Sequence, residues 1–195
     1  MSKEADGRSE GEVILSNDSI VSISGLNKKG LLLYSTSERK KGFADLHLFP
    51  LTKQGKQYAF HSRKGVAESL AKFIKYDWIA FTSDQTGRSE VFISDLTKPD
   101  VRTQFSFEGG EEPRYDSVNQ ILYYREVNKL MGASLSFGDN RSFKIGPAKA
   151  IFEDEDWINV PGYSWDMSPD GKRFLIIRRT SPKTSNEIKI SQHFR

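Results

Sequence analysis

One segment of the chain begins like a nucleophile elbow, whose pattern is Gly-x-Ser-x-Gly. Gly162, Ser164 and Asp166 occupy the three defining positions, so an aspartate replaces the last glycine. An elbow exposes its serine on a sharp turn between a strand and a helix. Here the turn sequence Ser168-Pro169-Asp170-Gly171 stands where that helix would begin. The pattern therefore predicts that Ser164 is not a nucleophile, and no catalytic residue is assigned.

The histidines offer no metal site. His47, His61 and His193 lie far apart in the sequence, and the chain has no cysteine that could supply a thiolate ligand or a disulfide. His47 alternates with apolar residues in a predicted strand, which favours a packing role. No metal-binding or cofactor-binding residue is assigned, and no cofactor is expected.

Four carboxylates have two interpretations. Asp84, Glu112, Asp116 and Asp166 each lie in or beside a predicted turn, where such side chains usually cap backbone amides. If the turns gathered on one face, the same four side chains could converge on a Ca²⁺ ion, which prefers oxygen ligands. Turn capping is the favoured interpretation.

An acidic run, Glu153-Asp154-Glu155-Asp156, precedes Trp157 and Ile158. We interpret the run as a solvated loop, with a docking patch for a basic partner or a cation site as the alternative. Trp157 and Ile158 would then either form an exposed anchor or pack back into the fold. Two glycosylation triplets, Asn17-Asp18-Ser19 and Asn140-Arg141-Ser142, are interpreted as chance matches.

A four-fold repeat must position all these residues. Four short apolar strands end at Tyr34, Phe81, Tyr124 and Ile177, which are spaced by 47, 43 and 53 residues. Each is followed by polar residues and then by a further short strand, and the sequence contains no helical pattern. A period of this length with short strands is typical of the blades of a β-propeller. The high aromatic content, with 13 Phe and 7 Tyr, also suits strands that are filled by large flat side chains.

The repeat predicts an all-β chain of four-stranded antiparallel blades after a disordered leader at residues 1–11. The propeller spans residues 12–195, with blades at about 17–62, 69–108, 112–153 and 162–193. Three blades have four predicted strands, and the last has three. In the second blade the last strand is predicted at 103–107. Residues 12–16 form a spare strand that either completes the last blade and closes a ring or ends an earlier blade.

Four segments resemble the PD40 or TolB-type WD40-like β-propellers of bacteria. They are Trp78 to Ile93, Gly109 to Tyr115, Lys129 to Met131, and Tyr163 to Leu175, which contains the Ser-Pro-Asp-Gly turn for which the repeat is named. The resemblance covers residues 12–192 and is greatest to the C-terminal blades of six-bladed propellers. It implies a partial or small ring of about four blades. Only the last blade keeps the named turn.

That turn is interpreted as a structural device. Pro169 presets its own φ, Asp170 can accept backbone hydrogen bonds, and Gly171 can adopt a left-handed conformation. Replacing Asp170 with alanine is therefore expected mainly to lower stability, as for a lost cap.

The resemblance implies a non-enzymatic binding or scaffold module, with a protein or peptide partner or a small ligand, or the sensor part of a larger protein. The alternatives are a propeller hydrolase or lactonase with a channel metal, and the propeller portion of a prolyl-oligopeptidase-like peptidase. Binding is expected in the loops at 36–44, 84–89, 136–147 and 153–162, because loops carry recognition on repeat scaffolds. Self-association to complete a ring is also expected.

Composition narrows the partners and the compartment. The chain has 195 residues, with 29 basic and 26 acidic side chains that are interspersed, so no nucleic-acid or membrane-surface footprint stands out. No stretch approaches the 18 apolar residues of a membrane span, and the start lacks the apolar core of a signal peptide. We therefore expect a cytoplasmic protein, or a periplasmic one if the chain is a fragment.

Overall fold

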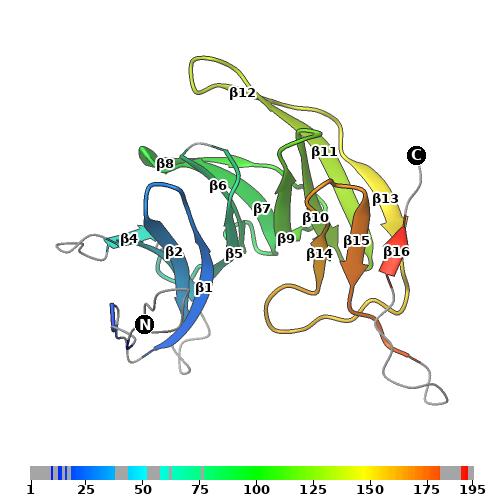
Figure 1. Ribbon diagram of the computed structural model, residues 1–195, viewed down its shortest axis with the longest axis horizontal. Helices are drawn as coiled ribbons and strands as arrows, with labels where there is room; N and C mark the ends of the chain where they lie inside the picture. The colour runs from blue at the N-terminus through cyan, green and yellow to red at the C-terminus, as the bar shows by residue number, and fades with distance from the viewer. Residues whose placement is uncertain are drawn as a thin grey trace.

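The computed structural model describes residues 10, 13, 14, 16, 19–37, 44–51, 58–61, 63–75, 77–180 and 190–192. In this part of the chain every regular element is a β-strand, and every strand pairing is antiparallel (Figure 1). The described residues therefore contain no helix that could cross a membrane. The predicted leader at 1–11 lies outside the described residues, apart from Glu10.

Each of the first two sheets has four strands in sequence order. The first sheet is built from β1 (Ile20–Leu26), β2 (Leu31–Ser37), β3 (Ala44–Pro50) and β4 (Tyr58–His61). The second is built from β5 (Glu68–Phe73), β6 (Trp78–Ser83), β7 (Glu90–Asp95) and β8 (Lys98–Gln104).

The third sheet is larger and the fourth is smaller. The third contains β9 (Glu111–Asp116), β10 (Ile121–Glu126), β11 (Lys129–Phe137), β12 (Phe143–Ile145) and β13 (Lys149–Glu153), with β12 and β13 paired to different parts of β11. The fourth contains β14 (Trp165–Met167), β15 (Arg173–Ile176) and β16 (Ile190–Gln192). These three strands match the three that the sequence predicts for the last repeat.

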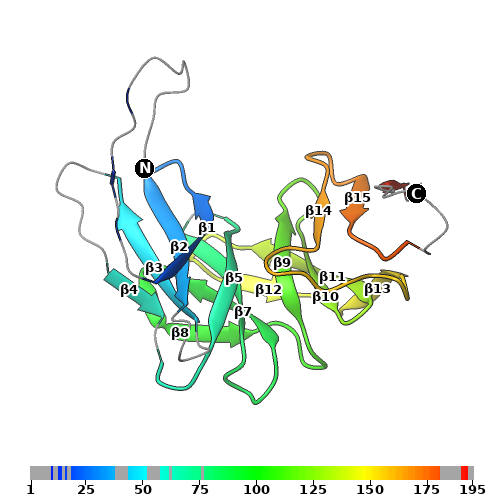
Figure 2. The same cartoon turned by 90° about the horizontal axis from the view of Figure 1, so that it is seen from below.

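The four sheets follow one another along an arc (Figures 1 and 2). In each sheet the first strand, β1, β5, β9 or β14, lies toward the middle of the arc, and later strands lie toward its outside (Figure 1). The first and fourth sheets stand at opposite ends of the molecule (Figure 2). Repeats that are distant in sequence therefore bring their first strands toward a common centre.

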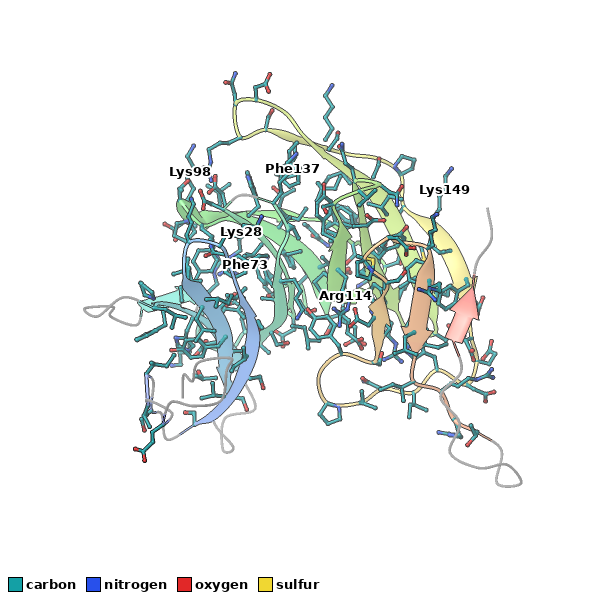
Figure 3. All side chains as sticks on the ribbon, in the orientation of Figure 1. Lys28, Phe73, Lys98, Arg114, Phe137 and Lys149 are labelled. Carbon is teal, nitrogen blue, oxygen red and sulfur yellow. The ribbon has the colours of Figure 1, made fainter. Side chains whose placement is uncertain are left out.

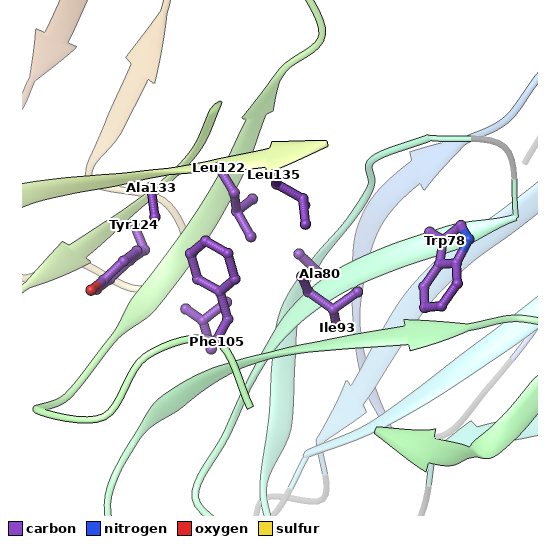
Figure 4. Packing of buried hydrophobic residues seen from close by; sticks show 9 residues of the cluster. Trp78, Ala80, Ile93, Phe105, Leu122, Tyr124, Ala133 and Leu135 are labelled. Atoms are coloured by element: carbon purple, nitrogen blue, oxygen red, sulfur yellow. The ribbon is translucent and has the colours of Figure 1, made fainter. Parts of the chain in front are cut away.

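The core fills the space between neighbouring sheets. On β6, Trp78 and Ala80 pack toward the third sheet, while Ile79 and Phe81 pack toward the first. Successive side chains of a strand point to opposite faces, so a strand covered on both sides needs a continuous apolar run. Figure 4 shows the cluster between the second and third sheets, where Phe105 meets residues of β6, β10 and β11.

The second strand of the fourth sheet, β15, is buried on one face only, whereas β6 is buried on both faces. On β15, Phe174 and Ile176 are buried against the third sheet, whereas Leu175 is exposed on the opposite face. No described element covers that opposite face. The fourth sheet thus keeps the antiparallel pairing of the other sheets, but it is packed on one face only.

Two sequence predictions need correction. The last strand of the second sheet is β8 at Lys98–Gln104, and not the predicted 103–107. This outer strand is polar and includes Pro99, so it lacks the apolar alternation by which the sequence reveals a strand; edge strands tolerate both features. Phe105 follows β8 and turns inward as a core residue.

The predicted loop at 136–147 contains the extra strand β12, because Phe143 packs edge-on against Trp78 at 5.1 Å between ring centroids. The predicted spare strand at 12–16 is described only at Val13, Ile14 and Ser16, and none of these three residues lies in a strand.

Candidate functional site

A cavity of about 290 Å³ opens where the first strands of three sheets approach one another. The residues around it come from β5, from β9 and the turn after it, and from β14 and the Ser-Pro-Asp-Gly turn. They are Lys72, Phe73, Arg114, Tyr115, Asp116, Ser117, Asp166, Met167, Ser168 and Pro169. Figure 3 labels Phe73 and Arg114 among all side chains, on the inner strands of the second and third sheets.

Two cations share one aromatic ring beside this cavity. The Lys72 Nζ atom lies 4.7 Å from the ring centroid of Tyr163, and the Arg114 Cζ atom lies 4.3 Å from it. Both distances fall within the range of cation–π attraction. The Tyr163 hydroxyl donates to the Leu70 carbonyl at 2.6 Å, which fixes the ring in place.

Each cation is also anchored to a neighbouring strand. Lys72 Nζ donates to the carbonyl of Ser24 on β1 at 2.9 Å. Arg114 Nε donates to the carbonyl of Trp165 on β14 at 3.1 Å, and its Nη1 atom lies 3.0 Å from Asp166 Oδ1. The first strands of all four sheets are thereby linked through polar contacts at this site.

Burial controls the protonation of the site. Burial lowers the pKa of Lys72, the nearby Arg114 guanidinium lowers it further, and Asp166 opposes both. Burial raises the pKa of Tyr163 far above its ordinary value, so this side chain stays a neutral hydroxyl donor. The site therefore combines two positive groups with one neutral donor and one exposed carboxylate, that of Asp166.

The sequence analysis did not identify Lys72, Arg114 or Tyr163. A signal was present, because the first strands of the last three repeats all carry charged side chains, among them Lys72, Arg114 and Asp166. Only the arrangement of the sheets shows that these strands meet.

Ser164 lies in a buried polar network next to the cavity. It is fully buried, and its backbone N–H donates to Glu112 at 2.6 Å while its Oγ lies 2.9 Å from both Glu112 oxygens. Arg125 Nη1 reaches Glu112 at 3.3 Å and Ser164 Oγ at 3.2 Å, and Trp157 Nε1 donates to Ser164 Oγ at 2.9 Å. These contacts give Ser164 a structural position, without the exposure that an elbow provides.

The four carboxylates considered for Ca²⁺ do not converge. Asp84 accepts the Ala67 N–H at 2.7 Å, which joins two segments of the second sheet, and Glu112 is held in the buried network. Asp116 accepts the N–H groups of its own turn. Asp116 and Asp166 border the same cavity, but the described residues hold no group of three or more His, Asp or Glu side chains that could bind a metal ion.

The acidic run is partly neutralised within the fold. Arg178 Nη2 lies 2.6 Å from Asp156 and 3.4 Å from Asp154, and Trp157 and Arg178 form an isolated β-bridge. Trp157 is only 6% exposed and stacks on Phe152 at 5.8 Å. The alternative of an exposed tryptophan anchor is therefore wrong, and this side chain packs back into the fold.

The remaining candidates lie elsewhere. His47 is buried on β3, stacks on Tyr34 and lies 2.7 Å from Thr36 Oγ1, as expected for a packing residue. Arg141 of the second glycosylation triplet pairs with Asp95 of the second sheet. The described part of the chain does not include Asn17, Asp18, His193 or the side chain of His61.

The Ser-Pro-Asp-Gly turn has the predicted geometry. Asp170 Oδ1 accepts the Lys172 N–H at 3.1 Å, and Gly171 has a φ of +68°. Hydrogen bonds from Ser168 and from the Lys172 amide lower the pKa of Asp170.

No family model matches the chain, and no curated protein matches it. Among solved structures, one from an analysis of two prolyl endopeptidases is similar over 89% of this chain, with a TM-score of 0.48 and 16% sequence identity. This chain spans 29% of that chain's length. A likeness at this level assigns neither a family nor an activity to the protein.

Proposed function

We propose that the four sheets are blades of a TolB-type or PD40 β-propeller and that the chain is a non-enzymatic binding module. The radial order supports this proposal, because the first strand of each sheet lies toward the middle of the arc and the last lies outside. Propeller blades are arranged in this way around a central channel. A second copy of this chain, or further blades of a longer one, would complete the ring.

The cavity between the inner strands is the observation that carries the binding function. It brings two cations, an aromatic ring and a carboxylate from separate sheets to one solvent-accessible place. The side chains that could suggest hydrolysis are engaged elsewhere, since Ser164 and Glu112 bind each other in a buried network. Convergent polar groups in a concave site are typical of a ligand-binding site.

A peptide array tests the binding function directly. Immobilised peptides of varied charge are probed with the wild-type chain, with the cavity variants Lys72→Gln and Arg114→Gln, and with Lys172→Gln as a control of equal charge change. We expect a set of peptides that both cavity variants lose and the control retains. Identical arrays for all four proteins would contradict the proposal.

Activity assays test the enzymatic alternatives. Chromogenic esters, a lactone and a prolyl peptide are incubated with the protein, with and without Ca²⁺, and with Ser164→Ala as the comparison. We expect no turnover above buffer. Turnover that requires Ca²⁺ would support a lactonase-like enzyme, and turnover that Ser164→Ala abolishes would support a serine hydrolase.

The mass of the particle in solution tests the assembly. Light scattering is expected to give a multiple of 22.2 kDa if copies complete a ring by self-association. A monomer at all concentrations would exclude self-association, and further blades would then have to come from a longer chain.

A further inference from the structure

We propose that the cavity between β5, β9 and β14 binds a carboxylate of an acidic ligand between Lys72 and Arg114, and that Asp166 is the counter-ion which this carboxylate displaces. The inference rests on the proposed binding function and names the chemistry that the same site recognises. A carboxylate on a peptide side chain and one at a peptide C-terminus share this chemistry.

The two cations are held in position before any ligand arrives. Their shared partner, the Tyr163 ring, is fixed by its 2.6 Å hydrogen bond to Leu70 and by the adjacent Ser164. Lys72 and Arg114 are each tied to a backbone carbonyl, of Ser24 and Trp165 respectively. Fixing donors in advance reduces the entropy that is lost on binding.

The two carboxylates of the cavity lining, Asp116 and Asp166, have different partners. The Asp116 carboxylate is buried and occupied by the N–H groups of Val118 and Asn119 and by the Asn119 side chain. Asp166 is the carboxylate of the lining that contacts Arg114. A ligand carboxylate placed between the two cations would offset the burial and the Arg114 repulsion, both of which lower the pKa of Lys72.

Donors remain available to receive that ligand. A lysine ammonium has three protons and an arginine guanidinium has five. Lys72 uses one on Ser24, and Arg114 uses its Nε and Nη1 groups on Trp165 and Asp166. The Nη2 group of Arg114 has no partner among the described residues. A carboxylate can thus receive hydrogen bonds from both cations.

Asp166 has the properties of a replaceable counter-ion. Its side chain is 58% exposed, compared with 18% for Arg114, and one Arg114 nitrogen contacts it. An exposed pair of this kind contributes little stability, so exchanging one carboxylate for another requires little energy. The neighbouring apolar walls, Phe73, Met167 and Pro169, can contact the aliphatic part of the ligand.

Calorimetry with succinate and with its neutral diamide tests the inference without requiring a known partner. We expect succinate, and not the diamide, to bind the wild-type protein. Arg114→Gln is expected to weaken binding at least about tenfold, which corresponds to ~1.4 kcal/mol. Asp166→Asn is expected to tighten it at least about threefold, because it removes the competing carboxylate.

Lys172→Gln is the matched control. Lys172 borders a separate cavity of about 280 Å³ between the third and fourth sheets, so its loss changes the net charge equally without altering this site. Thermal midpoints of all variants establish that they are folded. Asp166→Asn keeps the test decisive even if Lys72→Gln or Arg114→Gln fails to fold, because Asp166 is exposed.

Several outcomes would overturn the inference. Equal affinity for succinate and its diamide would show that the site does not recognise the charge of the ligand. Weaker binding by Asp166→Asn would show that Asp166 is a ligand-binding group and not a counter-ion. Tighter binding of inorganic phosphate than of succinate would show that the site recognises a phosphate and not a carboxylate. If peptides bind the array but succinate binding does not depend on Arg114, the inference fails while the binding function stands.

Two peptides then distinguish the sources of the carboxylate. One carries glutamates and an amidated C-terminus, and the other has no acidic side chain and a free C-terminus. Arg114-dependent binding of only the first identifies an acidic side chain as the ligand, and binding of only the second identifies a chain terminus. If neither peptide binds, the site takes only small carboxylates, and a peptide is not the ligand of the proposed binding module.

Discussion

Replacing Glu112 with glutamine is expected to destabilise the fold more than any surface substitution. Glu112 is 1% exposed, and its partner Arg125 has a side chain that is 5% exposed. The glutamine has nearly the same shape, so the change removes the negative charge while it leaves the packing intact. The Arg125 guanidinium then stays buried without its counter-charge.

The magnitude follows from the contacts. Loss of one member of a buried ion pair costs about 3–5 kcal/mol, because the remaining charge is uncompensated. We expect the lower end, about 3 kcal/mol, because a glutamine oxygen can still accept the Ser164 N–H that Glu112 accepts at 2.6 Å. For a chain of this size, that corresponds to a thermal midpoint lowered by about 6–12 °C.

Urea denaturation followed by tryptophan fluorescence measures this effect. Trp157 donates to Ser164 Oγ at 2.9 Å, so its emission reports on the network as well as on unfolding. Glu108→Gln is the matched control, since Glu108 is 84% exposed and its 3.8 Å pair with Arg88 should be worth less than about 1 kcal/mol. If Glu112→Gln and Glu108→Gln destabilise the protein equally, then the buried Glu112–Arg125 pair does not stabilise the fold as expected.

Two further substitutions address single residues. Burial and the nearby carboxylates of Glu126 and Glu90 raise the pKa of Tyr124 to about 12 from its ordinary value of 10.0, so its contribution to stability is present below pH 10 and lost as the pH rises toward 12. Tyr124→Phe should therefore lose less stability than the wild type between pH 10 and 12 in urea titrations, and parallel curves would contradict this linkage. Gly171→Ala should destabilise the protein by more than Gly65→Ala. Both positions have positive φ, at +68° and +80°, but only at Gly171 would a Cβ overlap the Asp116 carboxylate, whereas it meets nothing within 4 Å at Gly65. Equal losses in thermal midpoint would show that backbone strain alone matters at Gly171.

The sequence revealed the strands that are buried on both faces. β2, β6 and β10 each contain a continuous apolar run, and each matches its predicted position within a few residues. Such runs are visible because neighbouring sheets cover both sides of the strand. The polar outer strand β8 and the three-residue β12 were missed or misplaced, since pairing and packing with partners distant in sequence define them.

The candidate site was hidden from the sequence for a related reason. Lys72, Arg114 and Tyr163 are separated by 42 and 49 positions, and no local motif joins them. Their proximity arises because the first strand of every sheet lies toward the middle of the arc (Figure 1). By contrast, the Ser-Pro-Asp-Gly turn could be predicted in detail, because its geometry depends on four consecutive residues.

β9 contributes one residue to the buried network, Glu112, and another to the cavity, Arg114. Glu112 holds the Ser164 N–H, and two residues later Arg114 holds the Trp165 carbonyl and the Asp166 carboxylate. The segment from Tyr163 to Asp166 is thus attached to β9 at successive points, and the Tyr163 ring is placed against Lys72 and Arg114 as a result. Because Glu112 is buried and does not line the cavity, its role at the site is positional. Glu112→Gln still offers an oxygen to the Ser164 N–H, but it replaces Oε1, which accepts from Ser164 Oγ and Arg125, with an amide donor. It should therefore weaken succinate binding at temperatures where the variant is fully folded, while Glu108→Gln leaves the affinity unchanged. An unchanged affinity in Glu112→Gln would mean that Tyr163 is positioned by its own hydrogen bond to Leu70, independently of the network beneath it.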